Sequence, residues 1–181
     1  MTLASPKIET SPAYDRVARG LHWSMALLIA VTFILGLVVD AFPKSWEHGI
    51  VETHKVIGIT ILALVLARIF WRQGHRPPPS HELSPLVERA SGLGHFGLYL
   101  LMFAVPAIGL GYAIMRGQGL NFGLFAIPPF ALPVDRALSR PVREIHEWAA
   151  YALIGLAVVH ALAALWHHLV RKDGVLRRML P

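Results

Sequence analysis

The sequence of 181 residues contains no cysteine and little charge. The missing cysteine excludes disulfide bonds, thiolate-bound metals, Cys-ligated iron–sulfur clusters and covalently attached c-type haem. Only 15% of the residues are charged, against about a quarter in globular proteins. Because the charges collect in short stretches with long uncharged segments between them, the pattern is typical of an integral membrane protein.

Four segments are apolar enough to cross a bilayer, which takes about 20 residues. Uncharged runs cover residues 23–39, 96–115 and 148–166, and a run over about 56–71 contains only Arg68. We predict one membrane domain over residues 1–181, with helices over about 14–40, 53–72, 93–115 and 144–170. Because helices satisfy their own backbone groups in lipid, the predicted fold is an all-α membrane four-helix bundle.

The basic residues predict the orientation of this bundle. An even number of spans puts both termini on the same side of the membrane. That side and its connecting loop hold eleven of the 17 lysines and arginines, and the opposite side holds six. This asymmetry favours both termini in the cytoplasm.

Ten histidines are the most informative part of the composition. His146 and His160 are 14 residues apart, so on one helix they share a face within about 40° and lie about 21 Å apart along the axis. His54 is expected at the depth of His146, and His22 at the depth of His160. The natural pairs are therefore His54 with His146 and His22 with His160.

One imidazole pair at each depth favours haem over other cargoes. A zinc site uses three or four clustered ligands, whereas two axial histidines complete the coordination of a haem iron and suit it to electron transfer. We therefore predict two haems b between the helices. Alternatives remain: interhelical hydrogen bonding, a proton or metal transporter, a haem-free assembly factor, His167 in place of His160, or His95 in place of His22. Three further histidines are interpreted as solvated loop residues: His48, His75 and His81.

Six short motifs, spread over nearly the whole chain, carry a family resemblance. They are R-x-x-R-G-L-H-W (16–23), T-H-K-V-I-G (53–58), G-H-F-G-L-Y-L-L (94–101), M-R-G (115–117), I-H-E-W (145–148) and H-A-L-A-A-L-W-H-H (160–168). In this order they resemble the bacterial cytochrome b561 family of small di-haem membrane cytochromes. The resemblance implies four core helices in the inner membrane and two non-covalent haems b. It also implies axial ligands at four positions: His22, His54, His146 and His160.

The resemblance also suggests an activity. Small members of that family include enzymes that oxidise superoxide at the periplasmic face and reduce ubiquinone, and others that exchange electrons with a periplasmic redox protein. Lys55 and Arg116 are our candidates for attracting superoxide, although basic groups there could also pair with haem propionates, dock an acidic protein or contact solvent and lipid.

A quinone needs an apolar slot with a few polar groups. Arg68, Trp71 and His167 are candidates for that site at the cytoplasmic end, and the outer face is the alternative location. The expected partners are thus membrane lipid, ubiquinone, and superoxide or a redox protein. No nucleic acid is expected, and a homodimer is one option for assembly.

Overall fold

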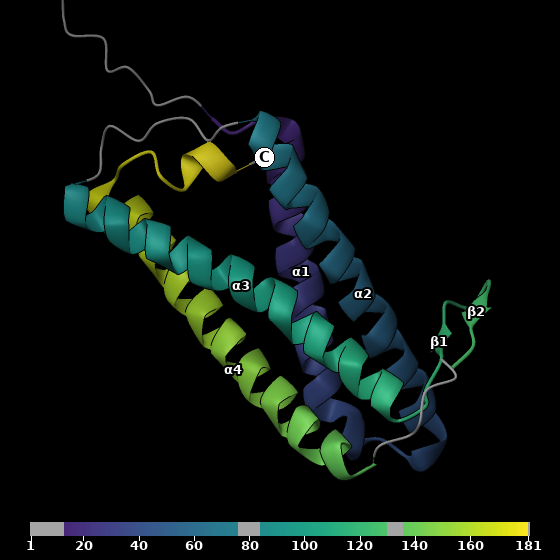
Figure 1. Ribbon diagram of the computed structural model, residues 1–181. Coiled ribbons are helices and arrows are strands. Elements are labelled where there is room, and N and C mark those ends of the chain that lie inside the picture. The colour runs from purple at the N-terminus through teal and green to yellow at the C-terminus, as the bar shows by residue number, and fades with distance from the viewer. Residues whose placement is uncertain (1–12, 76–83, 130–135, 181) are drawn as a thin grey trace, which may run out of the picture.

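The computed structural model describes residues 13–75, 84–129 and 136–180 and confirms an all-α four-helix architecture. The four long helices are α1 (Arg16–Val38), α2 (Lys44–Gly74), α3 (Pro85–Met115) and α4 (Arg136–Trp166). A 3-10 turn, η1 (Val39–Ala41), follows α1, and a π-helical turn, η2 (His167–Arg171), follows α4. All four long helices are apolar and long enough to cross a membrane (Figure 1).

Three helices begin earlier than the sequence predicted. The helix α2 begins at Lys44 rather than near residue 53, α3 at Pro85 rather than near 93, and α4 at Arg136 rather than near 144. Apolar length measures only the hydrocarbon crossing, and polar first turns continue a helix beyond it. Pro85 favours a helix start because it lacks a backbone N–H. Ion pairs about one turn apart support the first turn of α2 and the N-terminal part of α4.

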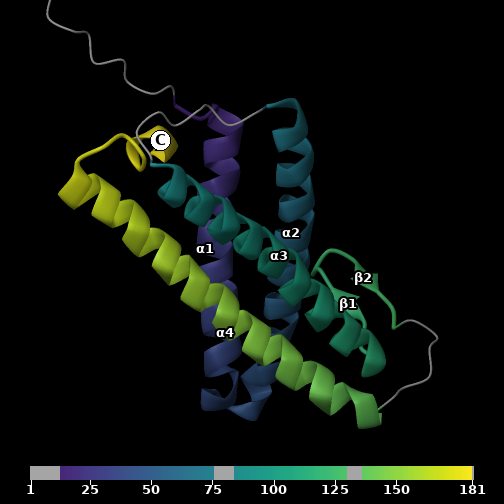
Figure 2. The same cartoon turned by 60° about the vertical axis from the view of Figure 1, so that its left-hand side comes forward.

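The helices form two crossed layers, α1 beside α2 and α3 beside α4 (Figures 1 and 2). Helices α2 and α3 join the layers. Helices α1 and α4 meet through side chains, including an edge-to-face contact of Phe33 with Tyr151 at 5.8 Å between ring centroids. The buried core among the described residues is small, and its main cluster is Met25, Ile61 and Val65. Much of the space between the layers is therefore lined by half-buried side chains, the histidines among them.

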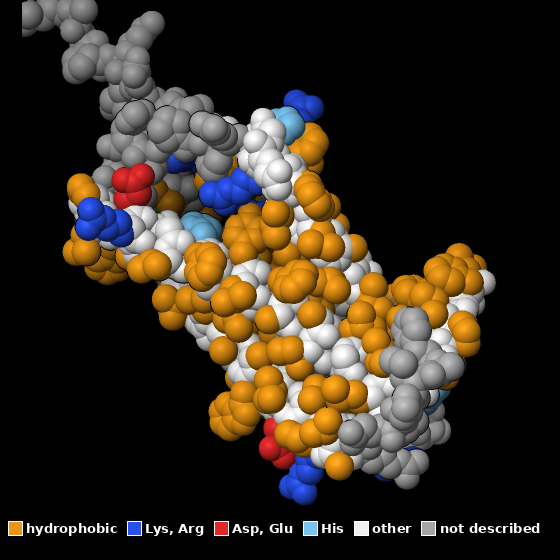
Figure 3. Space-filling view, in the orientation of Figure 1, with side chains coloured by type: hydrophobic (Ala, Val, Ile, Leu, Met, Phe, Trp, Pro, Cys, Tyr) orange, Lys and Arg blue, Asp and Glu red, His pale blue; other side chains and the backbone are white. Residues whose placement is uncertain are grey.

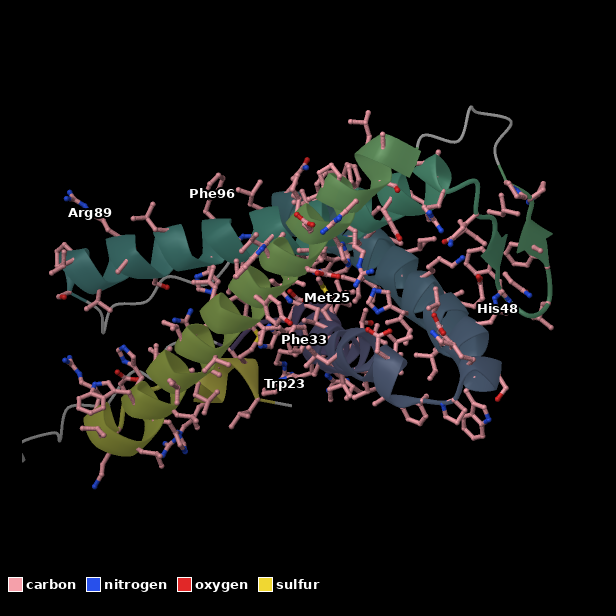
Figure 4. The ribbon with its side chains drawn as sticks, turned by 90° about the horizontal axis from the view of Figure 1, so that it is seen from below. Trp23, Met25, Phe33, His48, Arg89 and Phe96 are labelled. Atoms are coloured by element: carbon pink, nitrogen blue, oxygen red, sulfur yellow. The ribbon has the colours of Figure 1, made fainter. Side chains whose placement is uncertain are left out.

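The outer surface is apolar along the helices and charged at their ends (Figure 3). Phe96 on α3 is 67% exposed and Val159 on α4 is 61% exposed. Figure 4 shows Phe96 and Arg89 pointing away from the bundle, whereas Met25 faces its interior. Because water would not favour so much exposed apolar surface, this surface faces the acyl chains of a bilayer.

At one end of the bundle, which we call the outer end, α3 leads into a small hairpin. Strands β1 (Leu120–Asn121) and β2 (Ala126–Ile127) pair antiparallel, and Phe122 stacks on Phe125 with 4.7 Å between ring centroids. The hairpin stands beside α2, away from the space between the layers (Figures 1 and 2).

The opposite, inner end carries both ends of the described chain. Residues 172–180, here called the C-terminal strap, include the 3-10 turn η3 (Arg177–Met179) and return to the start of α1. The backbone N–H of Tyr14 donates to the carbonyl of Arg178, Arg19 Nη1 donates to Leu180, and the Trp23 indole donates to Met179, at 2.7–3.1 Å. The strap therefore links the end of α4 to the beginning of α1.

The beginning of α1 is fixed by its cap, Asp15. The carboxylate of Asp15 accepts hydrogen bonds from the backbone N–H of Ala18 and, at 3.2 Å, from the Trp71 indole of α2. The Ala18 bond, which favours the charged form, holds the pKa of Asp15 below its usual range. Asp15 thereby ties the inner ends of α1 and α2 together.

Candidate functional site: two opposed histidine pairs

The outer pair consists of His54 on α2 and His146 on α4. Their ring centroids are 6.1 Å apart. Each Nδ1 faces a backbone carbonyl, that of Thr32 at 3.0 Å for His54 and that of Val105 at 2.9 Å for His146. Because a carbonyl can only accept, each Nδ1 carries the proton and each Nε2 is left as a lone-pair donor. A hydrogen bond from Nδ1 to a backbone carbonyl is the contact that commonly orients metal-ligating histidines.

The inner pair consists of His22 on α1 and His160 on α4, with ring centroids 6.3 Å apart. His95 on α3 also lies here, 5.2 Å from His160, and its Nδ1 faces the carbonyl of Ser91 at 2.7 Å. The structure thus brings together three of the four imidazoles that the sequence proposed for this level. His167, the first residue of η2 directly after α4, instead contacts the Asp173 carboxylate.

The spacing of both pairs fits one metal ion between two imidazoles. A metal–imidazole bond is about 2 Å, so rings on opposite sides of one ion have centroids about 6 Å apart. Both pairs meet this requirement, and the contact of His95 with His160 is shorter. Within the described ranges, no three His, Cys, Asp or Glu residues lie close enough to form a closed metal site. The residues therefore fit a bis-imidazole group such as haem and do not fit tetrahedral zinc.

Two glycines leave space for the outer histidine rings to reach the backbone carbonyls that they hydrogen-bond to. Gly36 follows Thr32 by four residues on α1, and Gly109 follows Val105 by four residues on α3. A Cβ atom on Gly36 would lie 3.3 Å from the His54 ring, and one on Gly109 would lie 2.9 Å from the His146 ring. Because a Cβ leans toward the preceding helical turn, a side chain at either position would cover the carbonyl. A glycine inside an apolar span indicates close packing, but the sequence does not show that either glycine lies against a histidine ring.

The three quinone candidates have separate hydrogen-bond partners. Arg68 Nε donates to the Tyr99 hydroxyl at 2.8 Å, Trp71 donates to Asp15, and His167 pairs with Asp173. The inner ends of α2 and α4 lie on opposite sides of the molecule in both views (Figures 1 and 2). No contact between described residues joins the three side chains.

The remaining histidines differ in part from the loop interpretation. His48 is exposed on α2 rather than in a loop. His75 caps the end of α2 and stacks on Trp71 with 4.0 Å between ring centroids. His81 lies outside the described residues.

Lys55 and Arg116 occupy different environments at the outer end. The Lys55 side chain is 11% exposed, forms an ion pair with Glu52, and donates to the carbonyl of Gly119 at 2.9 Å. Glu52 also accepts from the backbone N–H of Asn121. This pair anchors β1 to α2. Arg116 is exposed at the end of α3, and no ion pair joins it to a carboxylate in the part of the chain that the structure describes.

Replacing Lys55 with methionine is therefore expected to release the hairpin. The substitution leaves Glu52 half-buried without its cation and Gly119 without its donor, while the side-chain length is kept. A nitroxide label on a single cysteine at Leu124, unique in a chain without cysteine, would show sharper spectral lines. Lys44→Met is the control because the Lys44 ion pair with Glu47 is exposed. An immobile label combined with lost superoxide turnover would instead support a catalytic role for Lys55.

The other outer basic residues are largely neutralised within their own helices. Arg140 pairs with Glu144, Arg143 with Glu147, and Lys44 with Glu47. Such exposed pairs contribute little stability, but they cancel charge locally. Among the outer basic side chains that the structure describes, Arg116 is therefore the one without a carboxylate partner.

Nearly the whole chain is similar to proteins of one known family. The family described as Prokaryotic cytochrome b561 matches residues 13–181. Cytochrome b561 homolog 2 of Escherichia coli is 34% identical over 175 residues, which are 94% of this chain and 93% of that protein. A Yersinia pestis protein named "Probable superoxide oxidase CybB" is 34% identical over 173 residues, and cytochrome b562 of Cereibacter sphaeroides is 34% identical over 178 residues. Each alignment covers 93% of this chain and 96% of the relative.

These matches cover the spans and both histidine pairs together, so they concern the site as well as the fold. They also agree with the resemblance carried by the six short motifs. An integral membrane protein with opposed imidazole pairs between its helices belongs, on this likeness, to the cytochrome b561 family of prokaryotes, whose members carry electrons in membranes on haem b.

Proposed function

We propose that the chain holds two haems b, one between His54 and His146 at the outer level and one between His22 and His160 at the inner level. One observation carries this proposal: two imidazole pairs, spaced 6.1 and 6.3 Å, each take one member from α4. Each haem iron, when bound, supplies a one-electron carrier. The protein supplies the axial nitrogens, their orientation and an apolar surround.

We further propose that the outer donor is superoxide and that the acceptor is ubiquinone. Two superoxide ions each give up one electron and leave as dioxygen, and one ubiquinone takes up two electrons and two protons. The name of the Yersinia pestis relative supports the donor. Arg116 supports it physically, because an exposed cation at the outer end attracts a small anion. A lipid-soluble acceptor suits a carrier whose surface faces acyl chains.

The proposed setting is the inner membrane of a bacterium with both termini in the cytoplasm. The hydrogen bond from the backbone N–H of Tyr14 to the carbonyl of Arg178 supports a shared side for the two described chain ends. The excess of lysine and arginine on that side favours the cytoplasm. The outer level would then face the periplasm. In this orientation a quinone would approach the inner level from the lipid, where Arg68, Trp71 and His167 remain separate candidates for contacting it.

A second candidate function is an electron shuttle for a periplasmic redox protein. The observation that favours it is the hairpin, whose Leu124 is 97% exposed and whose Phe125 is 61% exposed at the outer end. An apolar tip of this kind could be covered by a protein partner or by lipid. Turnover without any partner separates the two functions.

The deciding experiment is a spectrum followed by a turnover assay. Reduced-minus-oxidised spectra and a haem count on the purified protein should give low-spin b-type bands at two haems per chain. Enzymatically generated superoxide should then reduce a soluble ubiquinone analogue without an added protein. Two haems without this turnover would favour the shuttle, and a colourless protein after haem supplementation would contradict both functions.

Replacing Arg116 with glutamine is expected to lower kcat/KM for superoxide several-fold at low ionic strength, with a smaller effect at high salt. The matched control is Arg89→Gln, which removes the same charge from the inner end of the same helix, about 40 Å away at 1.5 Å per residue. Initial rates over a salt series measure both effects. Equal losses in the two variants would contradict local attraction by Arg116.

A further inference from the structure

Two arginines at the inner end of α2 converge on one tyrosine of α3. The guanidinium carbons of Arg68 and Arg72 both lie 5.8 Å from the centre of the Tyr99 ring. The two arginines are four residues apart and so share a face of α2. Positively charged side chains are visible in the recess between the inner ends of α2 and α3 (Figure 3).

The tyrosine orients the first of these arginines. Arg68 is half-buried, and its Nε donates to the Tyr99 hydroxyl at 2.8 Å. A guanidinium has five N–H donors in a planar fork. With Nε occupied, the edge formed by its two terminal nitrogens is left to bind two oxygens of one planar group. That edge matches a carboxylate in a bidentate geometry.

The positive charge of this site has no counterpart in the described chain. No carboxylate of residues 13–75, 84–129 or 136–180 forms an ion pair with either arginine. Charged groups inside a membrane span are costly and are normally paired. Two negative charges from a bound group would therefore balance the two guanidinium groups.

The location of the two arginines indicates which anionic group they bind. Arg68 lies close enough to act electrostatically on all three inner imidazoles: His22, His95 and His160. It also lies on α2, one of the helices that are long and apolar enough to cross a membrane. The proposed inner haem carries two propionate carboxylates, which match the site in number, charge and shape.

We propose that Arg68 and Arg72, with Arg68 oriented by Tyr99, form a carboxylate site for the propionates of the inner haem. This inference rests on the proposed inner haem. It moves Arg68 from the quinone site that the sequence suggested to the haem site. Tyr99 is a positioning residue, because it acts on the carboxylate through Arg68.

The test compares haem b with its dimethyl ester, which has the same ring and iron but no propionate charge. The full-length protein is produced in cells that cannot make haem and is supplied with either compound. Haems per chain are counted, and haem loss to excess apomyoglobin is timed. The variants are Arg68→Gln/Arg72→Gln and Tyr99→Phe, with Arg89→Gln as control.

In the unmodified protein, one of the two ester molecules should be lost about tenfold or more faster than native haem, the effect of losing a charge-assisted contact. The double variant should lose one native haem at a similarly raised rate. Combining ester and double variant should add little, because both remove one interaction. Tyr99→Phe should give a smaller increase, and Arg89→Gln none.

Each other result contradicts a specific statement. Equal retention of ester and native haem in the unmodified protein would overturn the propionate site, and this comparison needs no variant to fold. If the double variant alone accelerated haem loss, the arginines would bind another anion, such as a lipid phosphate. If neither compound bound at all, the proposed function itself would fail.

Discussion

Replacing Gly109 with alanine is expected to remove or loosen the outer haem although every proposed iron ligand is still present. The added Cβ would lie 2.9 Å from Cε1 and 3.1 Å from Nδ1 of His146. The ring cannot retreat without losing its hydrogen bond to the carbonyl of Val105. Loss of such an orienting bond typically weakens metal binding by about 10- to 100-fold. The rate of haem loss and the low-spin visible bands measure the effect.

Gly111→Ala is the matched control for this prediction. Gly111 lies on the same helix, and a Cβ there would meet nothing within 4 Å. Both substitutions favour the helix equally in intrinsic propensity, so the difference between them reports the contact with His146. Gly36→Ala should have a smaller effect in the same direction, because the corresponding distance to the His54 ring is 3.3 Å. Two normal haems in Gly109→Ala would show that the His146 ring is not held as described.

Replacing His146 with alanine is expected to reduce the haem content from two per chain to one. The opposed imidazole of His54 cannot complete six-coordination alone, so the outer haem should be lost or become high-spin. Superoxide-dependent quinone reduction should fall by about a hundredfold or more, since even the loss of a residue that only hydrogen-bonds to a metal ligand can cost that amount. His48→Ala is the control, because His48 is an exposed histidine at the same end.

Haem content in two further alanine variants shows which histidine faces His160 at the inner level. His22→Ala should lose one haem and His95→Ala should keep both, because the His22–His160 spacing suits one intervening ion and the His95–His160 spacing is shorter. Haem counts and low-spin bands are the measurement. The reverse outcome would transfer the ligand role to His95. Two low-spin haems in His146→Ala would remove the outer pair from the proposal altogether.

The fold was predictable because a helix that crosses lipid must be a long apolar run of the sequence. Apolar runs, three of them uncharged and one containing only Arg68, revealed all four spans. Helical periodicity put His146 and His160 on one face of what the structure shows to be one continuous helix. The helix starts were not predictable in the same way. The observed helix starts lie before the apolar runs, at Lys44, Pro85 and Arg136. There the apolar pattern gives no information about helix formation.

The contacts that orient the site depend on neighbours distant in the sequence. The carbonyl of Val105 reaches His146 across 41 positions, and Lys55 reaches the carbonyl of Gly119 across 64. No periodicity predicts such contacts. The sequence therefore suggested that Lys55 is an unpaired cation. The structure shows that Lys55 forms an ion pair with Glu52 and donates a hydrogen bond to the hairpin segment at Gly119. The convergence of Arg68 and Arg72 on Tyr99 was hidden for the same reason.

The sharing of α4 by both histidine pairs has a consequence for how the protein is made. The helix α4 is the last of the four to leave the ribosome, and it carries His146 and His160 together. Until it enters the membrane, His22 and His54 have no opposite imidazole. Under the proposed ligand sets, both cofactors are captured after synthesis of the chain rather than one after the other during it. A ribosome stalled before α4 should therefore expose a three-helix intermediate that retains neither.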